Sequence, residues 1–170
     1  MNSQQEFYKQ NRIDTMMYRV RRDAEEYLAN FNLFLDIEID NDSDTDYVGM
    51  YEHDSVFTGT IKVYLNLRAI EQDSEDDEFE YDVIITLYHE IGHALFDLVM
   101  SMDESDVKQY EEEYFNVFYD DNGYDEEELV EDFGQSFDPT METQSELRNL
   151  LSRMLSDHFD FDKYIWTDEN

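Results

Sequence analysis

The sequence of 170 residues contains no cysteine. Disulfide bonds, thiolate metal ligands and a cysteine nucleophile are therefore excluded, so any bound metal must be held by His, Glu or Asp. Histidine is scarce as well, with four residues in the whole chain. A pair of histidines at a defined spacing therefore carries more information here than it would in a histidine-rich chain.

The chain also lacks a long apolar run. Its most apolar stretch, residues 83–100, is interrupted by two histidines and two acidic residues, so no run of about 18 apolar residues spans a membrane. The first residues, MNSQQEFYKQNR, contain no apolar segment of the kind found in signal peptides. We therefore expect a cytoplasmic protein without a membrane partner.

Basic residues are few: 11 Lys and Arg stand against 45 Asp and Glu, for a formal net charge of −34. Residues 1–22 hold five bases and two acids, so the rest of the chain carries a net charge of −37. Such a surface repels nucleic-acid phosphates and attracts basic molecules. We expect no direct nucleic-acid binding and, if the protein has a macromolecular substrate, a basic protein or peptide. The oligomeric state stays open.

Bulky apolar residues are abundant despite the charge, with 13 Tyr and 12 Phe, which predicts a folded chain with a real core. We expect one domain, residues 1–170, of the α+β class. Its expected parts are an N-terminal helix at 1–31, strands within 33–67, a core helix at 81–102, a helix at 103–119, an acidic helix at 125–137, and a helix with its tail at 143–170. Alternating residues 57–67 form the clearest strand, and the spacing of Thr143 and Glu146 predicts a capping box for the last helix.

The chemistry is expected on the core helix, in the sequence His89-Glu90-Ile91-Gly92-His93. Residues four apart lie on one helix face, so His89 and His93 point the same way and can bind one Zn²⁺. Glu90 lies beside the first ligand and can take a proton from a water on the metal. Composition alone produces such a match on the order of 0.01 times per chain. Gly92, a poor helix former, indicates that something packs closely against this helix.

Two histidines leave the site incomplete, because a catalytic zinc usually has three protein ligands and a water. A third histidine six residues past His93 is absent, since Val99 occupies that position. The lone histidines His53 and His158 are weaker candidates.

HEIGH, followed about 40 residues later by the acidic helix EDFGQSF at 131–137, resembles the gluzincin branch of the zincin metallopeptidases. The likeness extends over residues 57–137 and is nearest to small ImmA/IrrE-type and lethal-factor-like members. It implies a zincin-like fold: a small mixed or antiparallel sheet on the HExxH helix, with a helical C-terminal half. It also implies that a Glu on the second helix is the third ligand.

Glu131 fits that family pattern best, with Gly134 as its small residue and Gln135 as a polar residue able to hydrogen-bond a ligand imidazole. A small residue there would let the two helices approach closely. Glu127 and Glu128 remain alternatives as the ligand. The lethal-factor-like members also have a Tyr seven residues before the ligand, here Tyr124, which could stabilise an oxyanion.

The resemblance further suggests that an extended peptide binds along an edge strand beside the motif helix. Residues 57–67 are the candidate for this edge strand, with a position inside the sheet as the alternative. The function expected from all of this is a zinc-dependent endopeptidase. The alternative is an acidic binding or inhibitor protein whose surface imitates nucleic acid and whose zinc site is structural or vestigial.

Overall fold

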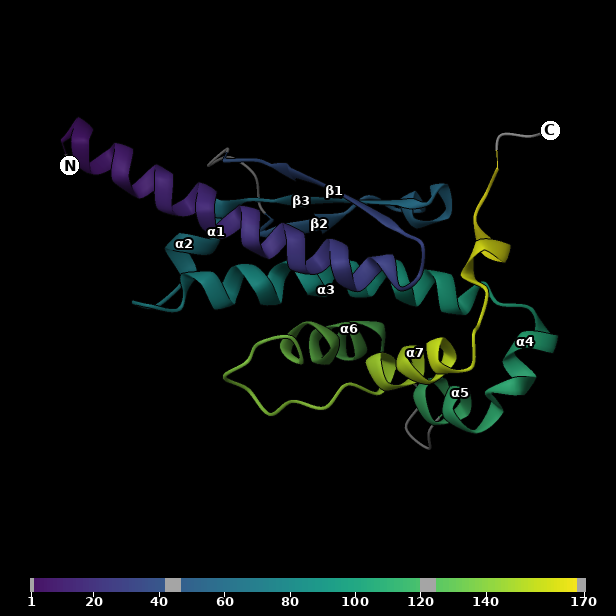
Figure 1. Ribbon diagram of the computed structural model, residues 1–170. Helices are drawn as coiled ribbons and strands as arrows, with labels where there is room; N and C mark the ends of the chain where they lie inside the picture. The colour runs from purple at the N-terminus through teal and green to yellow at the C-terminus, as the bar shows by residue number, and fades with distance from the viewer. Residues whose placement is uncertain (1, 42–46, 120–124, 168–170) are drawn as a thin grey trace.

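The computed structural model describes residues 2–41, 47–119 and 125–167. Within these residues the chain is of the α+β class, with seven helices and one three-stranded mixed sheet. Figure 1 shows the elements in three layers: the sheet, then the core helix α3, then α6 and α7. The elements are α1 (Ser3–Ala29), β1 (Phe34–Ile39), β2 (Gly49–Tyr51), β3 (Thr60–Leu65), α2 (Leu67–Asp73), α3 (Phe79–Met100), α4 (Glu104–Gln109), α5 (Glu111–Phe118), α6 (Glu126–Gln135) and α7 (Glu146–Ser156), with 3₁₀ turns at Ser55–Thr58 and Phe161–Tyr164.

The sheet has the strand order β1-β3-β2, with β1 parallel and β2 antiparallel to β3. β3 alternates between half-buried and fully buried residues, and Ile61, Val63 and Leu65 face inward. Helix α1 contacts β1 and α3, and its buried residues are Met16, Val20, Ala24 and Leu28. Because β3 is the middle strand, the alternative that places residues 57–67 inside the sheet is confirmed, and the edge-strand interpretation of this segment is wrong.

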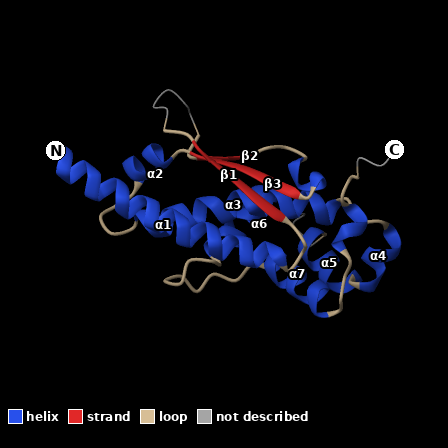
Figure 2. Ribbon diagram, turned by 45° about the horizontal axis from the view of Figure 1, so that its top comes forward, coloured by secondary structure: helices blue, strands red, loops and turns tan. Residues whose placement is uncertain are grey.

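Helix α3 lies beneath the strands (Figure 2). Leu87, Ile91, Ala94, Leu95 and Leu98 are fully buried, so this helix forms the centre of the core. Its length and composition alone would also suffice to cross a membrane, as is true of many core helices. The helix begins and ends within two residues of the predicted range 81–102.

Three local predictions need correction. The helix expected at 103–119 is divided into α4 and α5 at Tyr110, whose ring is buried against Phe159 and whose backbone leaves the helical conformation. Helix α7 is capped by Ser145, which accepts a hydrogen bond from the backbone N–H of Arg148, and not by Thr143. The strand expected at 57–67 ends at Leu65, and α2 begins at Leu67, capped by the Asn66 side chain.

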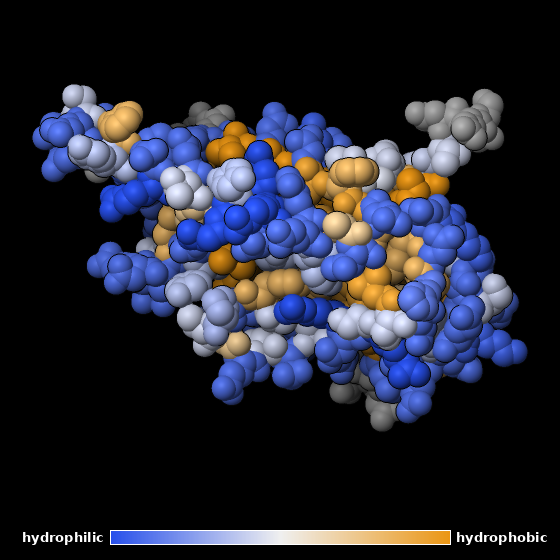
Figure 3. Space-filling view, viewed as in Figure 1, coloured by the Kyte–Doolittle hydropathy of each residue, from blue (hydrophilic) through white to orange (hydrophobic). Residues whose placement is uncertain are grey.

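The surface is mostly hydrophilic. On the face seen in Figure 3, apolar residues gather in patches over the middle of the molecule, and hydrophilic residues surround them. Some large apolar side chains are exposed, among them Phe7 and Phe34. The excess of Asp and Glu in the sequence thus lies on a solvated surface around a buried aliphatic and aromatic core.

Candidate metal-binding site

His89 and His93 lie one turn apart on the face of α3 that meets α6. Their ring centroids are 5.1 Å apart, and both side chains are largely buried, with 24% and 19% of their surface exposed. The helical spacing produces this pairing directly, since residues four apart lie one above the other. The structure therefore brings together the two histidines that the sequence singled out.

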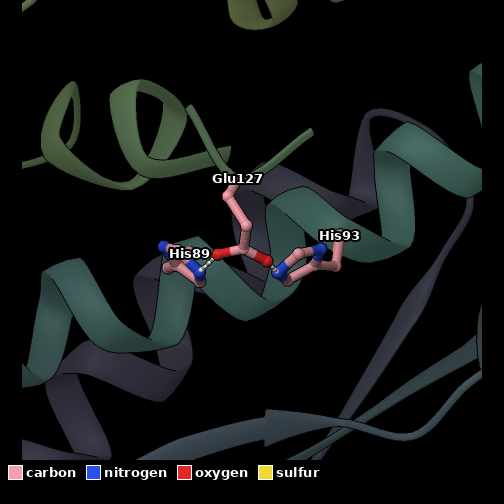
Figure 4. Close-up of side chains that lie close together, drawn as sticks. All are labelled: His89, His93 and Glu127. Atoms are coloured by element: carbon pink, nitrogen blue, oxygen red, sulfur yellow. Dashed lines mark ion pairs between the residues drawn. The ribbon is translucent and has the colours of Figure 1, made fainter. Parts of the chain in front are cut away.

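A carboxylate from α6 completes this group. The Asp125 side chain accepts a hydrogen bond of 3.0 Å from the backbone N–H of Glu127, which caps α6 and places its first turn over the histidines. Glu127 Oε1 lies 3.1 Å from His93 Nε2, and Glu127 Oε2 lies 3.4 Å from His89 Nε2. Figure 4 shows this carboxylate between the two imidazoles. One donor atom from each of the three side chains lies within 4.8 Å of the others.

Two glycines, Gly92 on α3 and Gly134 on α6, leave room for the two helices to approach each other. A Cβ on Gly134 would lie 2.7 Å from the carbonyl oxygen of Ile85 and 3.0 Å from the backbone nitrogen of His89. A Cβ on Gly92 would lie 3.0 Å from the Phe133 ring. Both glycines were expected at close contacts, and the structure confirms these contacts.

The acidic residue that joins the two histidines is Glu127, whereas the sequence favoured Glu131. Glu131 lies one turn further along α6, exposed to solvent, and its carboxylate is joined to Gln135 Nε2 at 3.4 Å. Glu127, not Glu131, meets the two Nε2 atoms. Gly134 packs against Ile85 and His89, and Val130 packs against Gly92, so the first turn of α6 lies over His93. Glu131 still acts on His89 electrostatically. Glu128 is exposed and is not part of the group that His89, His93 and Glu127 form. Gln135 was expected to hydrogen-bond an imidazole, but its side chain donates to Glu131 instead.

The remaining candidates lie elsewhere. His158 is an exposed residue at the end of α7, and His53 lies in a separate group with Asp54 and Asp97. Neither joins the pair on α3. Tyr124 falls outside the described residues.

Glu90 is half-buried between α3 and the edge strand β2. A Cβ on Gly49 would lie 3.2 Å from Glu90 Cγ, so the strand passes directly over this side chain. The backbone N–H of Tyr51 lies near enough to the Glu90 carboxylate to lower its pKa. At the flanking positions, the Val48 carbonyl accepts a hydrogen bond from the Asn66 N–H, and the Glu52 N–H donates to the Lys62 carbonyl. By the alternation of an antiparallel pair, Gly49 and Tyr51 turn their backbone groups away from β3. Among the described residues no strand pairs with that outer edge.

The burial of these groups changes their acidity. Burial, and then the neighbouring His93, lowers the pKa of His89, while Glu127 and Glu131 oppose the change. A neutral imidazole is the form that binds a metal. Burial also raises the pKa of Glu90, against the effects of His93 and of the Tyr51 N–H. A raised pKa brings a carboxylate closer to the range of an effective general base at neutral pH.

Glu126 is a site residue that the sequence did not reveal. Its Oε1 lies 3.1 Å from His93 Nδ1, the ring nitrogen on the opposite side from Glu127. A carboxylate on Nδ1 orients the imidazole and leaves Nε2 free for a metal. Within the run Asp-Glu-Glu-Glu at 125–128, nothing in the sequence separates Glu126 from its neighbours.

The donor set fits zinc. Two His nitrogens and one Glu oxygen are ligands that zinc accepts, and a catalytic site of this kind leaves a fourth position for water. Ligand atoms about 2.0–2.1 Å from a tetrahedral ion lie about 3.4 Å from one another. Glu127 meets the two Nε2 atoms through different oxygens, Oε1 at 3.1 Å from His93 and Oε2 at 3.4 Å from His89, so each of these two contacts is close to this spacing.

Comparisons with protein-family models, curated proteins and solved structures found no match to this chain.

Proposed function

We propose that this protein is a zinc-dependent endopeptidase with a zincin-like arrangement. One observation supports the proposal above all others: the Glu127 carboxylate lies between His89 Nε2 and His93 Nε2, with Glu90 on the same helix. The motif helix beside an antiparallel edge strand, and a second helix that supplies a carboxylate, further support the zincin-like arrangement.

In this proposal His89, His93 and Glu127 bind the metal. Glu126 accepts a hydrogen bond from His93 Nδ1 and orients that ring, and Glu131 favours positive charge near His89. When bound there, zinc would lower the pKa of a water ligand and polarise a carbonyl oxygen.

Glu90 is the general base. It accepts a proton from the attacking water and passes it to the leaving amine. The Tyr51 N–H near Glu90 belongs to the outer edge of β2, which pairs with no other strand among the described residues, and an extended peptide would pair its backbone there, next to Glu90. The strongly negative surface favours encounters with basic proteins or peptides.

The role of Glu90 is tested with Glu90→Gln, which keeps the size of the side chain and removes the base. We expect this variant to retain zinc and to lose cleavage of a panel of basic proteins by at least about 100-fold, the lower contribution of a general base. Glu104→Gln, an exposed residue on α4, is the matched control and should cleave normally. Unchanged proteolysis in Glu90→Gln would contradict this role.

The third ligand is tested by zinc affinity, which needs no substrate. Removing a residue that only supports a ligand costs about 10–100-fold in affinity. Glu127→Ala should exceed that loss and Glu131→Ala should stay within it, as measured by competition with a chelator. The reverse order would restore Glu131 as the ligand.

The alternative of an acidic binding protein predicts different results. Such a protein would bind a basic partner stoichiometrically and in a salt-sensitive way, and Glu90→Gln would leave that binding unchanged. Binding of this kind without cleavage by the wild-type protein would favour the alternative.

A further inference from the structure

A second group of charged side chains lies directly beyond His93. Asp97 follows His93 by four residues, so His89, His93 and Asp97 form one row on α3. The Asp97 side chain is 24% exposed. It lies within electrostatic range of both His93 and Glu126, which places it beside the metal ligands.

The chain that leaves β2 reaches the same place. His53 and Asp54 follow β2 within three residues of Tyr51, and Asp54 has a left-handed backbone with φ 65° that turns the chain. His53 Nδ1 lies 3.8 Å from Asp97 Oδ2, and His53 Nε2 lies 3.5 Å from Asp54 Oδ1. The segment formed by β2 and the residues after it therefore begins beside Glu90 and ends beside Asp97.

At this end of the edge, the acidic side chains that the structure describes have histidines but no Lys or Arg as ion-pair partners. Among the described residues, no Lys or Arg nitrogen lies within 4.0 Å of the carboxylates of Asp54, Asp97 and Glu126, and their ion-pair partners are His53 and His93 alone. Three carboxylates therefore gather acidic charge at this end of the edge. A Lys or Arg side chain is the peptide group that complements such a charge.

We propose that Asp97, with Asp54 and Glu126, selects a Lys or Arg side chain of an extended peptide that pairs with the outer edge of β2. This inference rests on the peptidase function proposed above and assigns its specificity to a defined position. The four residues from His93 to Asp97 span about 6 Å along α3. An extended peptide covers that distance in about two residues. The basic residue therefore lies within about two residues of the bond that is cleaved.

This selection differs from attraction by the overall charge. Long-range attraction raises the encounter rate of any basic peptide, wherever its charges lie, and salt screens it. A subsite at Asp97 favours Lys or Arg at one fixed position. The two effects are therefore distinguished by the position of the basic residue relative to the cleaved bond.

The test is cleavage-site profiling by mass spectrometry. The substrate is a peptide mixture prepared from a cell lysate with a Glu-specific protease, so that Lys and Arg remain inside the peptides. For the wild-type zinc-loaded protein we expect Lys or Arg at one fixed position within two residues of the cleaved bond. Asp97→Asn should reduce that preference by about tenfold, the effect of losing a charge-assisted hydrogen bond. Asp54→Asn should reduce it as well, and Asp73→Asn, an exposed residue on α2, should retain it.

Cleavage without a fixed basic position, or a preference that Asp97→Asn keeps, would overturn the inference and leave the peptidase intact. If the wild-type protein cleaves nothing, the peptidase function fails. The inference is then tested separately by the binding of two fluorescent peptides that are identical except for Lys in one and norleucine in the other. Equal binding overturns it, and tighter Lys binding that Asp97→Asn abolishes supports it. Two zinc ions per chain, reduced to one by Asp97→Asn, would also overturn it, because the group would then be a metal site.

Discussion

Replacing Gly134 by alanine tests the helix contact on which the proposed metal site depends. Gly134 is helical, so the substitution by itself would favour the helix by about 1 kcal/mol. The new Cβ, however, would lie 2.7 Å from the carbonyl oxygen of Ile85 and 3.0 Å from the backbone nitrogen of His89. These are backbone atoms of the core helix, and they cannot rotate away as a side chain would.

The magnitude follows from that distance. Ordinary contact begins at 3.4 Å, so α6 must move away from α3 by about 0.7 Å. Overpacking of a core costs about 1–3 kcal/mol, and a clash with backbone belongs at the upper end. After the gain in helix propensity, we expect a loss of about 2 kcal/mol in the free energy of unfolding. For a chain of this size that corresponds to a melting temperature about 4–8 °C lower.

The same displacement should weaken zinc binding, because metal–ligand distances are held to about 0.2 Å and Glu127 moves with α6. Urea unfolding of the metal-free protein measures the first effect, and chelator competition measures the second. Gly92→Ala is the comparison, since its Cβ would lie 3.0 Å from Phe133 Cδ1 and 3.2 Å from Val130 Cβ, both longer than the 2.7 Å contact at Gly134; a smaller loss is expected. A Gly134→Ala protein as stable as the wild type, with unchanged zinc affinity, would refute the close approach of the two helices.

Further predictions concern the core and the response to pH. Phe133→Ala removes a fully buried ring and should cost about 3–5 kcal/mol in urea unfolding; a loss below 1 kcal/mol would contradict its position. Burial raises the pKa of Tyr51 to about 12 in the folded chain, so the unfolded chain loses its proton first, and wild-type stability should fall as the pH rises from about 10 to about 12. Tyr51→Phe should lose less stability over that interval, and an identical decline would refute the assignment. The hydrogen bond from Lys163 is the main cause that lowers the pKa of Asp103, so the pair stabilises the fold above about pH 4 and ceases to do so as the pH falls. Lys163→Met should therefore be less stable than the wild type at pH 7 and approach it at low pH, as measured by denaturant unfolding at several pH values.

The sequence by itself determined the features that arise within one helix or one strand. The i, i+4 spacing of His89 and His93 puts both imidazoles on one face wherever the helix lies, and the bounds of α3 follow from its apolar pattern. Gly92 and Gly134 likewise indicated a close contact, because a glycine within a helix is costly unless something packs against it.

The choice among the acidic residues of α6 depended on the tertiary structure. Glu127, Glu128 and Glu131 are chemically alike, and which one meets the histidines depends on how α6 is positioned along α3, a matter of packing between segments about 40 residues apart. The role of Glu126 depends on the same positioning. The sequence could not show which strand forms the edge of the sheet, for a similar reason. β3 has the clearer alternation because it is the better-buried strand, whereas the short strand β2 occupies the edge beside Glu90. Periodicity reports the burial of each segment, and only the assembled chain decides which segments become neighbours.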